Sequence, residues 1–228
     1  MTTVVLVRHG LTHMTGPVLA GWTPDLHLDE RGQKQAAAVA ERLCPVQFDA
    51  LVSSPLDRCL DTIGYIAEGR DTPVKVEDRL GECKYGDWTG KPLKELAKDP
   101  LWKVVQQHPS AAVFPGPEGE PLRETQNRAV AAIRDWNDTL GPDATWLACS
   151  HGDVIKAIVA DAMGLHLDQF QRILIDPCSV TIIRYTETRP FVVRTNDTGG
   201  GVADLIPPPK KSRKKASSDA AVGGGAGA

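Results

Sequence analysis

Two histidines and two arginines follow short apolar segments of this sequence, at positions typical of strand ends. The four residues are Arg8, His9, Arg58 and His151, and the apolar segments that precede them are 4–7, 48–53 and 145–150. In open α/β sheets, ligands bind beyond the carboxyl ends of the strands. We therefore expect these four side chains to meet in one crevice, although they are far apart in the sequence.

Such a crevice would suit a phosphate group. Two guanidinium groups can bind phosphate oxygens in a bidentate manner. Helices that begin just after Ser54 and His151 would direct their first N–H groups at the same anion. An imidazole held among these groups can attack phosphorus and form a phosphohistidine, which divides one difficult transfer into two easier steps.

The remaining chemistry needs a proton donor and a further positive charge. The leaving alkoxide of a phosphate ester takes up a proton, and Glu82 is the natural donor. Its neighbours Glu77, Asp78 and, above all, Asp87 are the alternatives. The pKa of Glu82 would have to be raised for that role. A second, protonated imidazole would stabilise charge on the equatorial oxygens. Because arginines and an imidazolium supply the positive charge, we expect neither a metal ion nor another cofactor.

The elements that must position these residues alternate along the chain. Strands are predicted at 4–7, 48–53, 74–76, 145–150, 180–185 and 191–194. Helices are predicted at 29–43, from an N-cap at Ser54 onward, at 92–107 with a break near Asp99-Pro100, at 122–140 and at 152–163. This alternation predicts an α/β fold, a three-layer sandwich with a mostly parallel central sheet and helices on both faces.

Taken together, the polar segments resemble the histidine phosphatase superfamily, the phosphoglycerate mutase-like proteins. Five segments, in the order that the family has them, carry the resemblance over roughly residues 3–195: Arg8-His9-Gly10-x-Thr12, Leu28-x-x-x-Gly32, Ser53-Ser54-Pro55-x-x-Arg58, Glu82 with Gly86-x-Trp88-x-Gly90, and Ser150-His151-Gly152. One such motif would be weak evidence, whereas five in order are strong. Segments 100–102, 107–116 and 150–157 also resemble a bacterial subgroup of phosphatases or phosphomutases associated with mycothiol producers.

The resemblance implies a role for each of the main residues. His9 would be the phosphorylated nucleophile, and Glu82 would be the general acid and then the base that activates water. His151 would act in catalysis and bind the phosphoryl group, together with Arg8 and Arg58. The phosphoglycerate mutase-like fold is implied as well.

Four further residues follow from the resemblance or from their place near it. Thr12 would add a phosphate contact or a supporting hydrogen bond. Thr15, which stands where many relatives have Asn, keeps a hydroxyl donor for a phosphate contact. Gly21 and Trp22, in a Gly-Trp-Thr-Pro loop, are candidate walls of the substrate pocket. Many relatives have Gly-Glu-Ser before the long helix, where residues 119–121 of this chain are Gly-Glu-Pro. The substrate of a relative is therefore a weaker guide to the substrate of this chain.

The expected activity is that of a phosphatase, which hydrolyses a small phosphate monoester through a phosphohistidine. A phosphomutase is the alternative within the family, but mutases of this family carry a longer lid-forming insertion after the acid. Here only about 40 residues separate Glu82 from the helix that begins near Leu122. The mycothiol-related subgroup suggests a sugar or inositol phosphate as substrate.

Two alternative hypotheses assign the chain to other classes of protein. Glu82, His9 and His151 could hold a metal ion in a hydrolase, although no metal-binding motif supports this. A non-catalytic phosphate-binding module is the other, and it is disfavoured because no motif position is degraded.

Composition narrows the class of protein. The 228 residues are 41% hydrophobic, which suffices for a core, and the net charge of −3 argues against a mainly electrostatic nucleic-acid binder. No apolar run approaches the ~20 residues that cross a bilayer. The five cysteines form no C-x-x-C pair, which fits a reducing cytoplasm.

The composition changes near residue 198. We expect a catalytic domain at 1–198 and a disordered basic tail, rich in Pro, Gly and Ala, at 199–228, where the run 210–215 holds five basic residues. The expected partner is a small-molecule phosphate ester, without a membrane or nucleic-acid partner. The sequence leaves open whether the protein forms a homodimer.

Overall fold

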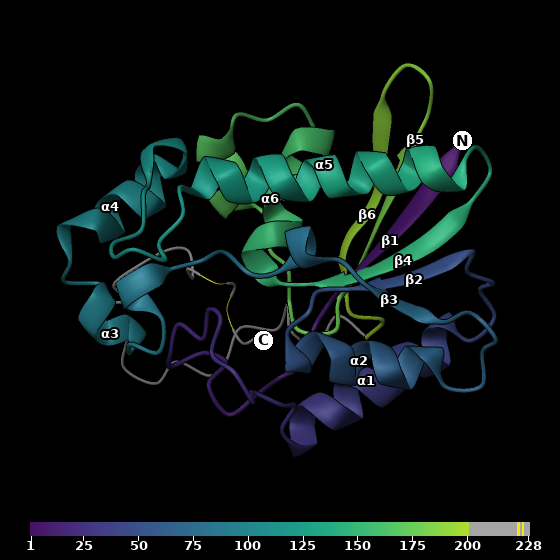
Figure 1. The fold of residues 1–228 in the computed structure, drawn as a ribbon, viewed down its shortest axis with the longest axis horizontal. Helices are drawn as coiled ribbons and strands as arrows, with labels where there is room; N and C mark the ends of the chain where they lie inside the picture. Colours follow the sequence, from purple (N-terminus) through teal and green to yellow (C-terminus); the bar gives the residue numbers. More distant parts are fainter. Residues whose placement is uncertain (201–222, 224, 226–228) are drawn as a thin grey trace.

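A six-stranded mixed sheet forms the centre of the molecule (Figure 1). The computed structural model describes residues 1–200, Gly223 and Gly225. The strands are β1 (Thr2–Arg8), β2 (Ala50–Ser53), β3 (Val74–Val76), β4 (Thr145–Ser150), β5 (Val180–Tyr185) and β6 (Pro190–Asp197). Their order is β3-β2-β4-β1-β5-β6, with parallel pairing from β3 to β1 and antiparallel pairing at β5 and β6. The predicted α/β class with a mostly parallel sheet is confirmed.

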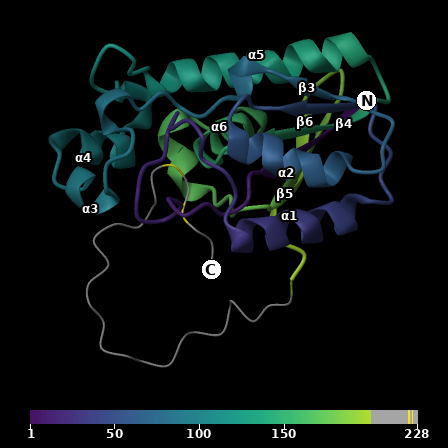
Figure 2. The same cartoon turned by 60° about the horizontal axis from the view of Figure 1, so that its bottom comes forward.

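Helices cover both faces of the sheet. The α-helices are α1 (Glu30–Leu43), α2 (Asp57–Ala67), α3 (Leu93–Leu96), α4 (Pro100–Gln107), α5 (Leu122–Leu140) and α6 (Gly152–Ala162). Short 3-10 helices are η1 (Asp78–Leu80), η2 (Gly86–Trp88), η3 (Pro109–Ala111) and η4 (Leu167–Arg172). Helices α1 and α2 lie on one face and α5 and α6 on the other, while α3 and α4 form an extension at one end (Figures 1 and 2).

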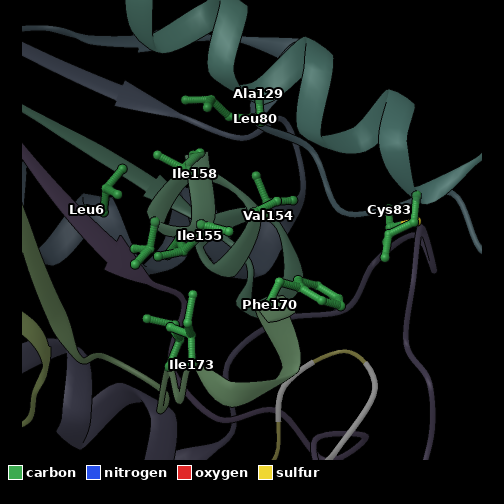
Figure 3. Packing of buried hydrophobic residues seen from close by; sticks show 14 of the residues in the cluster. Leu6, Leu80, Cys83, Ala129, Val154, Ile155, Ile158, Phe170 and Ile173 are labelled. Carbon is green, nitrogen blue, oxygen red and sulfur yellow. The ribbon is translucent and has the colours of Figure 1, made fainter. Parts of the chain in front are cut away.

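Alternating side chains of β1 serve two separate cores. Val4 and Leu6 belong to the larger core on the α5 and α6 side, and Val5 and Val7 belong to the core under α1 and α2. Successive side chains of a strand point to opposite faces, so one apolar run fills both layers. Figure 3 shows Leu6 beside Ile155 and other apolar side chains of α6 in the larger core.

The start of α2 differs from the sequence prediction. The helix begins at Asp57, and its N-cap residue, Leu56, offers no side-chain hydrogen bond. Ser54, the predicted N-cap, instead places its Oγ 2.7 Å from Nε2 of His151, and it accepts the N–H of Leu56 at 3.3 Å. The hydroxyl is therefore used to hold an imidazole on a neighbouring strand end.

Part of the chain lies outside the described residues. Residues 201–222, 224 and 226–228, which include the basic run, belong to that part, so the expected tail at 199–228 stays a prediction. Within the described residues, no helix is long and apolar enough to cross a membrane.

Glycines let the first turn of α1 pack against the loop that follows β1. A Cβ on Gly10 would lie 2.7 Å from the carbonyl oxygen of Gly32. A Cβ on Gly32 would overlap the carbonyl oxygen of Leu11. Because both neighbours are backbone atoms, neither can move aside cheaply. The glycine in the segment Leu28-x-x-x-Gly32 thus permits a close backbone contact beside His9.

We expect Gly32→Ala to lower the free energy of unfolding by about 1–3 kcal/mol, since overpacking against backbone forces a local shift. The matched control is Gly64→Ala on α2, where a Cβ meets no atom within 4 Å. That control should gain about 0.5–1 kcal/mol, because alanine loses less conformational entropy in a helix. Urea unfolding measures both, and equal effects of the two substitutions would contradict this packing argument.

Candidate active site

The carboxyl end of β1, the first turn of α2 and several loops line one cavity. Its lining residues are Arg8, His9, Thr15, Gly16, Val18, Leu19, Ala20, Gly21, Arg58, Glu82, Tyr85, Leu93 and Gly223. With Gly223 in place, only about 30 Å³ of free volume remains. Five of the predicted catalytic or phosphate-binding residues thus meet although they are widely separated in the sequence: Arg8, His9, Thr15, Arg58 and Glu82.

His9 presents one ring nitrogen to Arg58. Its Nδ1 lies 2.7 Å from the carbonyl oxygen of Gly10, which can only accept, and Nε of Arg58 donates to its Nε2 at 3.3 Å. A guanidinium has no acceptor atom, so Nε2 must carry the lone pair and Nδ1 the proton. Burial lowers the pKa of His9 well below 6.5, with Arg58 and Arg8 adding to the effect. The ring is therefore neutral at pH 7.

Arg58 is a buried hub on α2. Its Nη2 donates to the carbonyl oxygen of Gly21 at 2.7 Å and to Nδ1 of His151 at 3.2 Å. Its Nη1 is buried and has no hydrogen-bond partner in the described part of the chain. Asp61, one turn further along α2, accepts a hydrogen bond from His27 and not from Arg58. Burying an unused charged donor is costly, so Nη1 is suited to receive an anion.

Arg8 adds a second buried guanidinium to the cavity. Its side chain is 1% exposed, and Nη1 donates to the carbonyl oxygens of Ile175 at 2.8 Å and Gly225 at 2.6 Å. Both arginines thus face the same cavity, which gives it a strong preference for a negatively charged group.

His151 stands behind Arg58 at the N-terminus of α6. Its Nδ1 accepts from Arg58, which leaves Nε2 to donate to Oγ of Ser54. Its ring centroid lies 5.2 Å from that of His9. We expected a protonated ring, but burial lowers its pKa well below 6.5 and Arg58 lowers it further. A third positive charge beside two guanidinium groups is unfavourable until an anion is bound.

Glu82 is a buried carboxyl group in the lining of the cavity. It follows η1 and is 3% exposed. Its Oε1 accepts the N–H of Cys83 at 2.9 Å, and Oε2 lies 3.9 Å from Nδ1 of His151. Burial and the charge of Asp153 raise its pKa to about 7. Asp87, the alternative acid, is exposed and does not line the cavity.

The four additional predicted residues divide into two groups. Thr15 and Gly21 line the cavity. Thr12 does not, but its Oγ1 lies 3.0 Å from Oγ1 of Thr15 and so helps to hold that hydroxyl. Trp22 is absent from the lining, because its indole N–H donates to the carbonyl oxygen of Glu82 at 2.6 Å. Trp22 was predicted as a wall of the substrate pocket, whereas in the structure it supports the backbone at Glu82.

Several lining residues escaped the sequence analysis. The apolar and small ones are Gly16, Val18, Leu19, Ala20 and Leu93, which carry no chemical signal. Tyr85 also lines the cavity, and its place inside the Glu82–Gly90 segment could have suggested it. Asp153 does not line the cavity but hydrogen-bonds to Tyr85, and its place directly after Ser150-His151-Gly152 was a comparable signal.

The metal reading finds no geometric support. No group of three or more His, Cys, Asp or Glu side chains that could hold an ion occurs within the described residues. In addition, the guanidinium of Arg58 donates to both imidazoles that the reading would use as ligands.

Comparison with known proteins decides the family. The profile of the histidine phosphatase superfamily (branch 1) matches residues 4–198. The chain belongs to this superfamily. The resemblance and the predicted enzyme class, a histidine phosphatase, are therefore confirmed.

The relatives include phosphatases and mutases. Phosphoserine phosphatase 1 of Hydrogenobacter thermophilus is 29% identical over 214 residues, which cover 87% of this chain and 93% of that protein. A 2,3-bisphosphoglycerate-dependent phosphoglycerate mutase 2 of Gloeobacter violaceus is 30% identical, with 78% of this chain and 83% of that protein covered. The solved structure of a mycobacterial glucosyl-3-phosphoglycerate phosphatase has a TM-score of 0.76 at 25% identity, covering 86% and 98%.

The raised pKa of Glu82 predicts a pH-dependent stability. Its pKa is about 7 in the folded protein and 4.5 ordinarily, so the folded state holds this proton more tightly than the unfolded chain. The free energy of unfolding therefore falls between these values as pH rises. The variant Glu82→Gln cannot titrate at this position. We expect its free energy of unfolding, relative to that of the natural protein, to rise by about 1–3 kcal/mol between about pH 5 and about pH 8.

Glu120→Gln serves as the control for that pH series. Although burial acts to raise it, the pKa of Glu120 is lowered, chiefly by hydrogen bonds from Arg128. The change in the free energy of unfolding caused by Glu120→Gln should thus be similar at both pH values. Unfolding by urea at the two pH values measures the effect, and a gain for Glu82→Gln that is constant with pH would contradict it.

Proposed function

We propose that this chain is a metal-independent phosphomonoesterase that hydrolyses a small phosphate monoester through a phosphohistidine on His9. The observation that carries the proposal is the tautomer of His9. Its protonated Nδ1 is held by Gly10, and its Nε2 lone pair points at the guanidinium of Arg58. A neutral imidazole aimed at an anion site is the arrangement that nucleophilic attack on phosphorus requires.

The first step transfers the phosphoryl group to His9. Arg8 and the free Nη1 of Arg58 bind the phosphoryl oxygens, with Thr15 close to the same group. Nε2 attacks phosphorus, the bond from phosphorus to the ester oxygen breaks, and Glu82 gives its proton to the leaving alkoxide. A pKa of about 7 leaves Glu82 partly protonated at neutral pH, as a general acid needs.

The second step releases phosphate. Glu82, now a carboxylate, accepts a proton from water, whose oxygen attacks the phosphorus of the phosphohistidine. The bond from phosphorus to nitrogen breaks and inorganic phosphate leaves. The dianion also compensates the charge of Arg58, so the pKa of His151 rises when the phosphoryl group is bound and the ring can then add a positive charge.

A phosphomutase is the second candidate, and the similarity to a phosphoglycerate mutase favours keeping it. A mutase returns the phosphoryl group to substrate rather than to water. Release of free phosphate without a bisphosphate cofactor supports hydrolysis, and dependence on such a cofactor supports the mutase. A binding module without catalysis would release none.

We place the substrate among sugar or inositol phosphates and the protein in the cytoplasm. The expected partner is a small-molecule phosphate ester, without a nucleic-acid partner.

We expect His9→Ala to lower kcat/KM for p-nitrophenyl phosphate on the order of 10³-fold or more, because the covalent route is lost. The matched control is His13→Ala, since His13 is exposed in the same loop and does not line the cavity. Quenching the natural protein during turnover should trap an acid-labile phosphoenzyme that His9→Ala lacks. Unchanged phosphate release by His9→Ala would overturn the covalent mechanism.

A further inference from the structure

Two residues near the C-terminus occupy the candidate active site. The N–H of Gly223 donates to Oδ2 of Asp153 at 2.9 Å, and the carbonyl oxygen of Gly225 accepts from Nη1 of Arg8 at 2.6 Å. Gly223 also lines the cavity, where its position is close to Leu19 and to the hydroxyl of Tyr85. The site therefore accommodates a hydrogen-bond acceptor at its Arg8 end and a hydrogen-bond donor at its Asp153 end.

Asp153 is held firmly in the orientation that meets this donor. Its side chain is 1% exposed, and Oδ2 also accepts from the hydroxyl of Tyr85 at 2.9 Å. Its Oδ1 lies 3.4 Å from Nζ of Lys156, which is 3% exposed. Since Lys156 already compensates the charge of Asp153, the free capacity of Oδ2 suits a neutral donor such as a hydroxyl group.

The cations of the cavity are confined to its phosphate end. Among the described lining residues, only Arg8 and Arg58 carry a permanent positive charge, and the proposed function uses both for the phosphoryl group. The lining toward Asp153 consists of Leu19, Tyr85 and other uncharged side chains. A carboxylate or second phosphate on the leaving group would face the carboxylate of Asp153, and the ammonium group of Lys156 beside it is already paired with that carboxylate.

We propose that Asp153 is a specificity residue that accepts a hydrogen bond from a hydroxyl on the leaving group, so that the enzyme selects phosphates of small polyols over phosphorylated acids. This inference rests on the proposed function. It assigns the two ends of one substrate: phosphoryl oxygens on the arginines, and a hydroxyl where Gly223 now donates.

Three alkyl phosphates of similar size test this selection in the full-length protein. They are n-propyl phosphate, which has no hydroxyl group, glycerol 3-phosphate, which has two, and 3-phosphoglycerate, which has a carboxylate in place of one. We expect kcat/KM for glycerol 3-phosphate to exceed that for n-propyl phosphate by about 10-fold and that for 3-phosphoglycerate by about 100-fold. Equal or faster turnover of 3-phosphoglycerate would overturn the inference without any variant.

The variant Asp153→Asn assigns the discrimination to this residue. Its loss of charge changes the pKa of Glu82, but that effect is common to three alkyl leaving groups and cancels in the ratios. We expect the preference for glycerol 3-phosphate over 3-phosphoglycerate to shrink at least about 10-fold, because the like charge is removed. An unchanged ratio in folded Asp153→Asn, judged by its circular dichroism, would contradict the role of Asp153.

The failure of this inference and that of the proposed function give different results. If His9→Ala still releases phosphate from all three esters, the covalent phosphatase itself is refuted. If release depends on His9 while the ratios show no preference for the polyol phosphate, only the selection by Asp153 is refuted.

Discussion

The hydrogen bond between Nδ1 of His9 and the carbonyl oxygen of Gly10 is the constraint on which the site depends. A neutral imidazole in water exists as two tautomers, and the tautomer that carries its proton on Nε2 has no lone pair at that atom. The backbone acceptor selects one tautomer, and the donor at Arg58 requires the same one. Burial then keeps the ring neutral. Three separate effects thus favour the same reactive form.

The charge balance of the site follows from its burial. Arg8 and Arg58 carry two positive charges in a region where water is excluded, and they depress the pKa of both imidazoles. A carboxyl group in the same region is protonated more readily, so Glu82 titrates near 7. Because burial acts in opposite directions on bases and acids, one environment provides a neutral nucleophile and a neutral proton donor together.

Much of the fold was predictable because its signals are local. Apolar runs, Gly141 after the long helix and Asp99-Pro100 between α3 and α4 each act within a few residues, and the helix at 122–140 and the strand at 145–150 were predicted with their observed bounds. The resemblance to the family added the order of the motifs. The expected cap at Ser54 was wrong, since its hydroxyl forms a long-range contact with His151 that local rules do not include.

The sequence predicts which residues are catalytic more readily than it predicts their protonation states. The end of β1 and the helix that follows β2 bring His9 and Arg58 to one cavity, as the topology requires. Glu82 follows η1 rather than a strand, and its role came mainly from the resemblance to the family. The neutral state of His151 depends on the distance to Arg58, which only the folded chain defines. Leu19 and Leu93 line the cavity through shape alone, and apolar residues of that kind occur throughout the sequence.

The position of β1 within the sheet has a consequence for how the site responds to fluctuations. β1 lies between β4 and β5 and carries Arg8 at its end, with His9 next in the chain. Amide protons of a strand that is paired on both sides and packed on both faces exchange with solvent through the largest openings of a protein. Fraying at β3 or β6, the two edges of the sheet, therefore leaves the nucleophile in place, and its geometry lasts as long as the folded state itself.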